Sequence, residues 1–80
     1  MSLQNVLEQI GLSKQETATY LAVLELGQAP ALRIAHKAGI KRPTTYVILA
    51  SLHEKKLVQA IPKGSTTLFE ATNPERILQT

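Results

Sequence analysis

Basic side chains are concentrated in the middle of this eighty-residue chain, and their chemistry is that of phosphate binding. Residues 33–63 carry seven lysines and arginines against one acid, Glu54, for a net charge of +6, whereas the whole chain has a formal charge of +3. The seven are Arg33, Lys37, Lys41, Arg42, Lys55, Lys56 and Lys63. This concentration favours a nucleic-acid backbone as partner, the alternative being a solvated charged surface.

The inventory of catalytic and metal-binding side chains is poor. The chain has no cysteine and two histidines, and its six acids are all glutamates scattered along its length. A Ser-His-Asp triad cannot be assembled, no His and Glu spacing suits a metal, and the four glycines lie too far apart for a phosphate-binding loop. We therefore predict that the protein is not an enzyme and uses no cofactor and no metal ion.

The helices that position the basic residues follow from the spacing of apolar residues. Four are predicted, over residues 3–10, 14–26, 30–38 and 43–56. Ser13 and Glu16 have the spacing of a capping box at the start of the second helix. Pro30 and Pro43 each suit the first helical position, where the missing N–H costs nothing.

After Leu57 the hydrophobic period changes from that of a helix to that of a strand. Residues 58–71 are rich in β-branched side chains around Lys63-Gly64-Ser65, which predicts a β-hairpin. Asn73-Pro74-Glu75 has the signature of a helix start, so a C-terminal helix is predicted to begin over 74–80. A short helix, a tight turn, a longer helix and a hairpin predict a winged helix-turn-helix, mainly α with a β-hairpin wing, forming one domain over residues 1–80.

The helix over 43–56 is the predicted recognition helix. Its inward side carries Thr45, Ile48, Leu49 and Leu52, and its outer side carries Pro43, Val47, Ala50 and Glu54. Since only the first turns of such a helix reach base edges, the candidate base contacts are Arg42, Thr44, Tyr46 and Val47. For Tyr46 packing against the wing is the slightly better interpretation, and for Thr44 a role at the helix start is an equal alternative. The full predicted DNA-binding set is Arg33, Lys37, Lys41, Arg42, Pro43, Thr44, Tyr46, Val47, Lys63 and Ser65.

Three stretches carry an ordered pattern: IGLSKQETATYLAVLELG, RIAHKAGIKRPTTYVILASLHEKKLV and NPERIL. From Leu7 to Leu78 this pattern resembles the N-terminal domain of the TrmB-type transcriptional regulators of archaea and bacteria. The resemblance implies a sequence-specific double-stranded DNA-binding domain that usually works as a dimer. In such regulators a C-terminal region senses an effector, often a sugar, and we expect no small-molecule site in this segment.

Three features depart from the family pattern. Lys56 stands where glycine is common, so a left-handed backbone conformation is predicted there, at a cost of roughly 1 kcal/mol. Val47 and Ala50 stand where acidic residues are common, which makes the outer helix side apolar. Lys41 stands where proline is frequent and adds a positive charge at the helix entrance.

Two functions from different classes fit these observations. The first is a transcription regulator domain that binds duplex DNA, as a homodimer on DNA or within a longer protein. The alternative is a winged-helix module that docks another protein through Pro43, Val47 and Ala50. The +6 segment favours the first. No apolar run is long enough to cross a membrane, and the N-terminus lacks the charged and apolar regions of a signal peptide, so we expect a cytoplasmic, nucleoid-associated protein.

Overall fold

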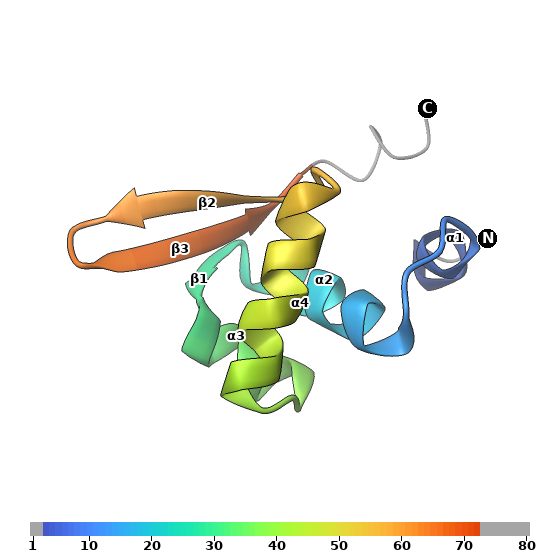
Figure 1. Cartoon of the computed structure of the whole chain (residues 1–80), viewed down its shortest axis with the longest axis horizontal. Coiled ribbons are helices and arrows are strands. Elements are labelled where there is room, and N and C mark those ends of the chain that lie inside the picture. Colours follow the sequence, from blue (N-terminus) through green and yellow to red (C-terminus); the bar gives the residue numbers. More distant parts are fainter. Residues whose placement is uncertain (1–2, 73–80) are drawn as a thin grey trace.

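The structure is a computed structural model that describes residues 3–72 (Figure 1). The predicted C-terminal helix over residues 74–80 lies outside the described residues. The elements in chain order are α1 (Leu3–Gln9), α2 (Lys14–Leu26), β1 (Gln28–Pro30), α3 (Ala31–Ala38), α4 (Arg42–Glu54), β2 (Val58–Lys63) and β3 (Thr66–Ala71). This architecture is mainly helical, and the β2–β3 hairpin extends away from the helices as the predicted wing (Figure 1).

Helix α2 begins at the predicted capping box. Ser13 Oγ accepts a hydrogen bond from the Glu16 N–H, and Glu16 Oε1 accepts one from the Ser13 N–H, each at 3.1 Å. These two bonds satisfy backbone donors that the first turn of a helix leaves free. The second helix therefore starts where the sequence predicts, and its bounds, 14–26, are also as predicted.

A short strand was missed by the sequence analysis. Strand β1 pairs antiparallel with β3, with Ala29 opposite Phe69, and the sheet has the order β1-β3-β2. Pro30 ends this strand in an extended conformation, φ −72° and ψ 160°, and caps α3, which begins at Ala31. Placing Pro30 at the first helical position was therefore wrong by one residue. A proline is tolerated here because β1 lies at the edge of the sheet.

The other helix bounds differ from the predicted ones by one or two residues. Helix α1 ends at Gln9, and Ile10, predicted as its last residue, is 50% exposed. Helix α4 begins one residue before the predicted start, at Arg42, and ends two residues before the predicted end, at Glu54. It ends early because Lys56 has a positive φ and is not helical. Strands β2 and β3 agree with the predicted hairpin, with Lys63 opposite Thr66 at the turn.

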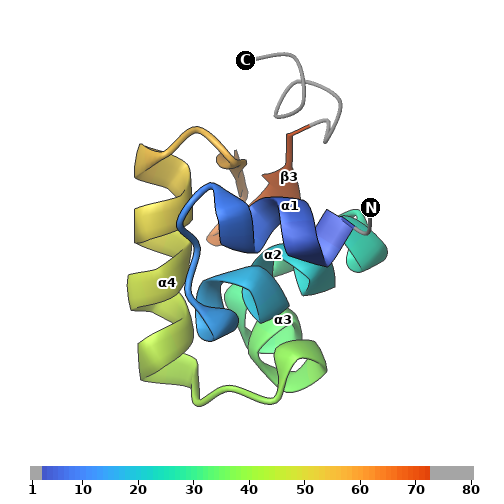
Figure 2. The same ribbon diagram turned by 90° about the vertical axis from the view of Figure 1, so that its right-hand side faces the viewer.

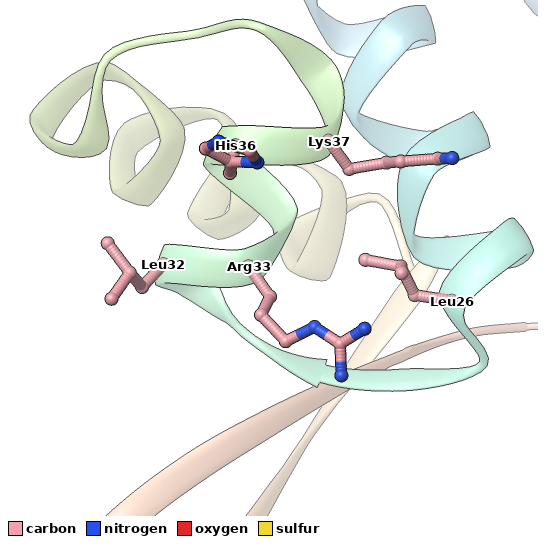
Figure 3. Close-up of a pocket in the computed structure, with 5 residues that line it drawn as sticks. All are labelled: Leu26, Leu32, Arg33, His36 and Lys37. Atoms are coloured by element: carbon pink, nitrogen blue, oxygen red, sulfur yellow. The ribbon is translucent and has the colours of Figure 1, made fainter.

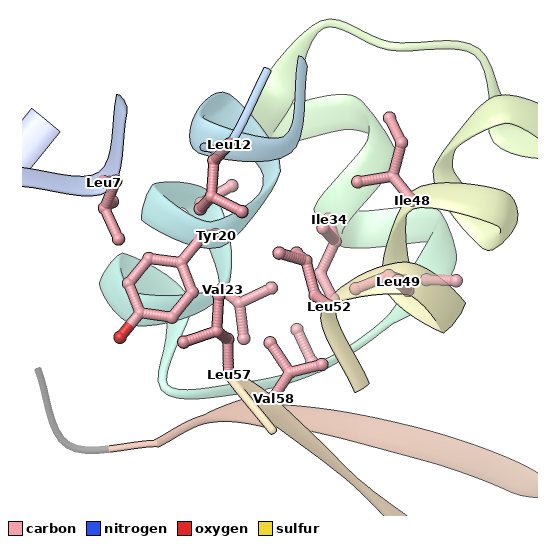
Figure 4. Packing of buried hydrophobic residues seen from close by; sticks show 13 residues of the cluster. Leu7, Leu12, Tyr20, Val23, Ile34, Ile48, Leu49, Leu52, Leu57 and Val58 are labelled. Atoms are coloured by element: carbon pink, nitrogen blue, oxygen red, sulfur yellow. The ribbon is translucent and has the colours of Figure 1, made fainter. Parts of the chain in front are cut away.

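The core lies where α2, α3 and α4 meet one face of the sheet. Leu7 of α1 belongs to this core and lies near Tyr20 of α2 (Figures 2 and 4). Tyr20 is fully buried within the core, and burial raises the pKa of its phenol. Its hydroxyl donates a 3.0 Å hydrogen bond to the carbonyl of Thr72, which fixes the end of β3 against α2. Among the described residues, no helix is long and apolar enough to cross a membrane.

Candidate nucleic-acid interface

The turn between α3 and α4 sets how α4 is oriented relative to α3. Gly39 adopts the left-handed conformation, φ 71° and ψ 32°, which glycine reaches without steric cost, and it ends α3. Two residues later the carbonyl of Lys41 accepts bonds from both the N–H and the hydroxyl of Thr45, each at 2.9 Å. Because Thr45 is fully buried, these bonds fix the start of α4 on the core and leave Arg42 and Pro43 exposed.

Helix α4 buries the predicted side. Thr45, Ile48, Leu49 and Leu52 are all buried. On the opposite side the structure exposes Pro43, Val47, Ala50 and Glu54, and Val47, at 71%, is the most exposed large apolar residue of those described. The apolar outer side expected from the sequence is thus open to a partner.

The end of α4 confirms the conformation predicted for Lys56. Lys56 has φ 64°, and no other non-glycine residue among those described has a positive φ. The N–H of Lys56 donates to His53 O and that of Leu57 to Leu52 O, which is the hydrogen-bond pattern of a Schellman motif. The lysine therefore occupies the position that favours glycine, and the chain turns sharply from α4 into the wing.

A half-buried acid, Glu16, holds α4 to the start of α2. The Glu16 carboxylate accepts bonds from Lys55 Nζ at 2.8 Å and from Ser51 Oγ at 2.9 Å, in addition to its bond at the capping box. The bond from Lys55, aided by those from the Ser13 N–H and Ser51, lowers the pKa of Glu16 to about 2. Lys55 is therefore engaged in holding two helices together, which accounts for one of the seven basic residues.

A groove of about 510 Å³ separates the start of α4 from the wing. Its walls come from the start of α3, from α4 and from the hairpin, and its lining residues are Pro30, Ala31, Leu32, Arg42, Tyr46, Ser65, Thr66, Thr67 and Phe69. Tyr46, 47% exposed, therefore faces the same groove as the wing residues rather than the outer side of α4. Thr67 and Phe69 lie outside the predicted DNA-binding set, although their spacing of two places both on one face of β3.

All the predicted contact residues except Thr44 are exposed, and most of the cations among them have no ion-pair partner among the described residues. Arg33, Lys41, Arg42 and Lys63 form no ion pair with another described residue. Lys37 forms one with Glu25 of α2, with 3.5 Å between Nζ and Oε2, and both side chains are largely solvated. Thr44 is half-buried at the start of α4, and Ser65 lies exposed beside Lys63 at the wing turn.

A second, apolar hollow of about 430 Å³ lies between α3 and the end of α2 (Figure 3). Leu26 and Leu32 line it together with Arg33, His36 and Lys37. Leu32 is 58% exposed, a feature that the sequence pattern of α3 did not reveal. Within the part of the chain that is described, no three His, Asp or Glu side chains gather closely enough to hold a metal ion.

These elements define a winged-helix domain: a helix-turn-helix formed by α3 and α4, followed by a hairpin in a three-stranded antiparallel sheet. The chain belongs to the TrmB family, since the family model described as sugar-specific transcriptional regulator TrmB matches residues 7–75. It is 34% identical over 73 residues to the HTH-type sugar sensing transcriptional regulator TrmBL1 of Pyrococcus furiosus. That match covers 91% of this chain but only 21% of TrmBL1, so the chain spans about a fifth of its relative.

Solved structures share the fold. TrmBL2, described as an archaeal chromatin protein, superimposes with a TM-score of 0.82 and 24% identity, over 96% of this chain and 29% of TrmBL2. BpsR of Bordetella bronchiseptica superimposes with a TM-score of 0.78 and 17% identity, over 95% of this chain and 56% of that protein. At these identities the two structures establish the winged-helix fold alone.

Proposed function

We propose that this domain binds double-stranded DNA in a sequence-specific manner, as the DNA-binding part of a transcriptional regulator. The observation that carries the proposal is the set of exposed cations on α3, at the entrance of α4 and on the wing, four of which have no acidic partner among the described residues. Unpaired cations on the elements that meet DNA in a winged helix are suited to displace the counterions of a phosphate backbone. The regulator names carried by the relatives support this proposal.

In the proposed complex, α4 enters the major groove with its first turns against the base edges. Arg42 donates to a guanine edge, Thr44 bonds a base or touches a thymine methyl, and Val47 offers apolar contact. Arg33, Lys37 and Lys41 contact phosphates along the helix-turn-helix. At the wing turn Lys63 and Ser65 contact the backbone or the adjacent minor groove. Two copies of the domain bind one operator, and the protein acts in the cytoplasm on the nucleoid.

The test of this proposal is selection of bound sites from a pool of random DNA duplexes. A DNA-binding domain retains duplexes at low salt and enriches a defined sequence over successive rounds. Retention without enrichment would limit the function to binding without sequence preference. Absence of retention would contradict DNA binding altogether.

One observation favours a second function. Pro43, Val47 and Ala50 form an exposed apolar side of α4, with Val47 71% exposed. Such an apolar patch can bind another protein as readily as it can contact the methyl groups of thymine bases. Retention of the purified wild-type domain on duplex DNA separates the two functions, because only the DNA-binding function requires it. Val47→Glu should weaken either kind of complex, so in a domain that does bind DNA it tests whether the apolar side of α4 lies in the DNA interface.

A further inference from the structure

One side of α4 faces the wing across the groove and carries Arg42 and Tyr46. Arg42 and Tyr46 are four residues apart, so their side chains leave the helix on the same side. Arg42 Nη2 donates a 3.4 Å hydrogen bond to the Tyr46 hydroxyl, and Arg42 Cζ lies 5.8 Å from the centroid of the Tyr46 ring. The guanidinium therefore makes two contacts with Tyr46, a long hydrogen bond to the hydroxyl oxygen and a cation–π contact with the face of the ring, each near the outer limit of its range.

This contact holds Arg42 without neutralising it. The guanidinium has five N–H donors in a rigid plane, and the bond to Tyr46 uses one of them. Neither of the two ion pairs among the described residues involves Arg42, because Glu16 pairs with Lys55 and Glu25 pairs with Lys37. Arg42 is thus oriented along the wall of the groove and retains the donors for a bidentate contact.

Orientation matters for an arginine at an exposed helix start. A free arginine samples many rotamers and loses them when it binds, which opposes binding and lets the charge reach any nearby phosphate. An arginine already held in one geometry loses less on binding, and its fork meets one base edge better than others. This entropic advantage is larger for a bidentate contact with a base edge, which requires one geometry of the guanidinium, than for a contact with a phosphate.

We infer that Tyr46 is a positioning residue: its hydroxyl and ring fix the Arg42 guanidinium for reading one base, and so Tyr46 determines specificity through Arg42 rather than through its own contact with DNA. The inference rests on the proposed DNA-binding function and adds to it a division of labour on α4. Arg42 makes the contact, and Tyr46 fixes where Arg42 can make it.

A double-mutant cycle tests this assignment. The variants are Tyr46→Leu, Tyr46→Phe, Arg42→Ala and the double variant Arg42→Ala/Tyr46→Leu, each titrated with the selected duplex and with a scrambled duplex. We expect Tyr46→Leu to weaken binding to the selected duplex by roughly three- to tenfold and to the scrambled duplex by less than about twofold. Tyr46→Phe keeps the ring, so it should retain most of the affinity.

The decisive measurement is the effect of Tyr46→Leu when Arg42 is already absent. In the Arg42→Ala background, the additional Tyr46→Leu change should alter the affinity by less than about twofold, because the residue it positions is gone. An undiminished loss in that background would overturn the inference and make Tyr46 a DNA contact or a structural residue. Equal melting temperatures of all variants would exclude the structural explanation, as expected for a side chain that is 47% exposed.

A measurement without DNA keeps this inference separate from the proposed function. In the free domain the side-chain NMR signals of Arg42 should carry a ring-current shift that Tyr46→Phe preserves and Tyr46→Leu abolishes. Identical Arg42 signals in the wild type and Tyr46→Leu would overturn the inference even if the domain binds DNA. Failure to bind any duplex with the shift present would instead overturn the DNA-binding function.

Discussion

Arg42 and Lys63 are both exposed and cationic, yet their geometry suits them to different contacts. Arg42 is a planar fork held at the start of α4, whereas Lys63 is a flexible point charge at the wing turn. Arg42→Ala should therefore cost roughly 1–3 kcal/mol on the preferred site and much less on random DNA. Lys63→Ala should weaken binding to both about equally and by a smaller amount. Paired titrations on the two duplexes measure the difference.

Lys14→Ala provides the control for a generic loss of charge. Lys14 is exposed on the first turn of α2, outside the predicted DNA-binding set, so its removal should change neither titration appreciably. If Arg42→Ala lowers both affinities by the same factor, Arg42 binds a phosphate, and base reading must pass to Thr44, Tyr46 or Val47.

Lys56 is the other residue whose conformation leads to a direct prediction. Its φ of 64° costs a lysine roughly 1 kcal/mol, and a glycine avoids that cost. Lys56→Gly should therefore raise the free energy of unfolding by up to about 1 kcal/mol, measured by urea denaturation. Lys56→Ala removes the same charge but keeps a Cβ, so it should bring no such gain. A matching gain in the alanine variant would mean that charge repulsion, and not the backbone, destabilises this position.

At the scale of elements, the Glu16 cluster joins α2 to α4 and makes their packing dependent on pH. The pKa of Glu16 is about 2 in the folded state against an ordinary value of 4.5. Since the folded pKa is the lower one, the stabilisation is fully present above about pH 5 and is lost as the pH falls from 4.5 towards 2. Glu16→Gln should lower the free energy of unfolding by about 1–3 kcal/mol at pH 7. At pH 2 the variant and the wild type should be nearly equal.

Glu25→Gln is the matched control for that experiment. Glu25 also pairs with a lysine of another helix, but its side chain is 68% exposed and the pair is screened by solvent. Its loss should leave stability and its pH dependence nearly unchanged. If the two variants behave alike, the Glu16 cluster contributes no more than a surface ion pair.

The elements also show which features a sequence can predict. The capping box of α2 and the inward side of α4 depend on neighbours within a few residues, so their spacing revealed them. Strand β1 has only three residues and exists because it pairs with β3, about forty positions later, which no local pattern indicates. The bond between Glu16 and Lys55 joins residues 39 apart and was equally hidden. For the site, spacing predicted the exposed outer side of α4 and placed Arg42 at the helix entrance. The shape of the groove that Arg42 and Tyr46 share with the wing depends on the tertiary fold.

At the scale of the whole molecule, the charges are distributed unevenly. Several acids of the described chain are engaged with partners on other elements: Glu16 with Lys55, Glu25 with Lys37, and Glu70 with the Gln28 amide across β1 and β3 at 2.6 Å. The cations of the predicted DNA-binding set are mostly unpaired. We therefore expect a positive field over the helix-turn-helix and the wing turn that would steer DNA towards them in the proposed function.

This distribution leads to a prediction for the salt dependence of DNA binding. If each protomer neutralises about three phosphates with its free cations, a dimer on DNA should show a slope of about −5 in log affinity against log salt concentration. Lys63→Ala should make the slope shallower by about one per protomer, while Lys14→Ala should leave it unchanged. The slope is measured by titrating one duplex at a series of potassium chloride concentrations. A slope near zero would mean that the free cations do not meet phosphates, and it would favour protein docking through the apolar side of α4, because burial of Pro43, Val47 and Ala50 releases no counterions.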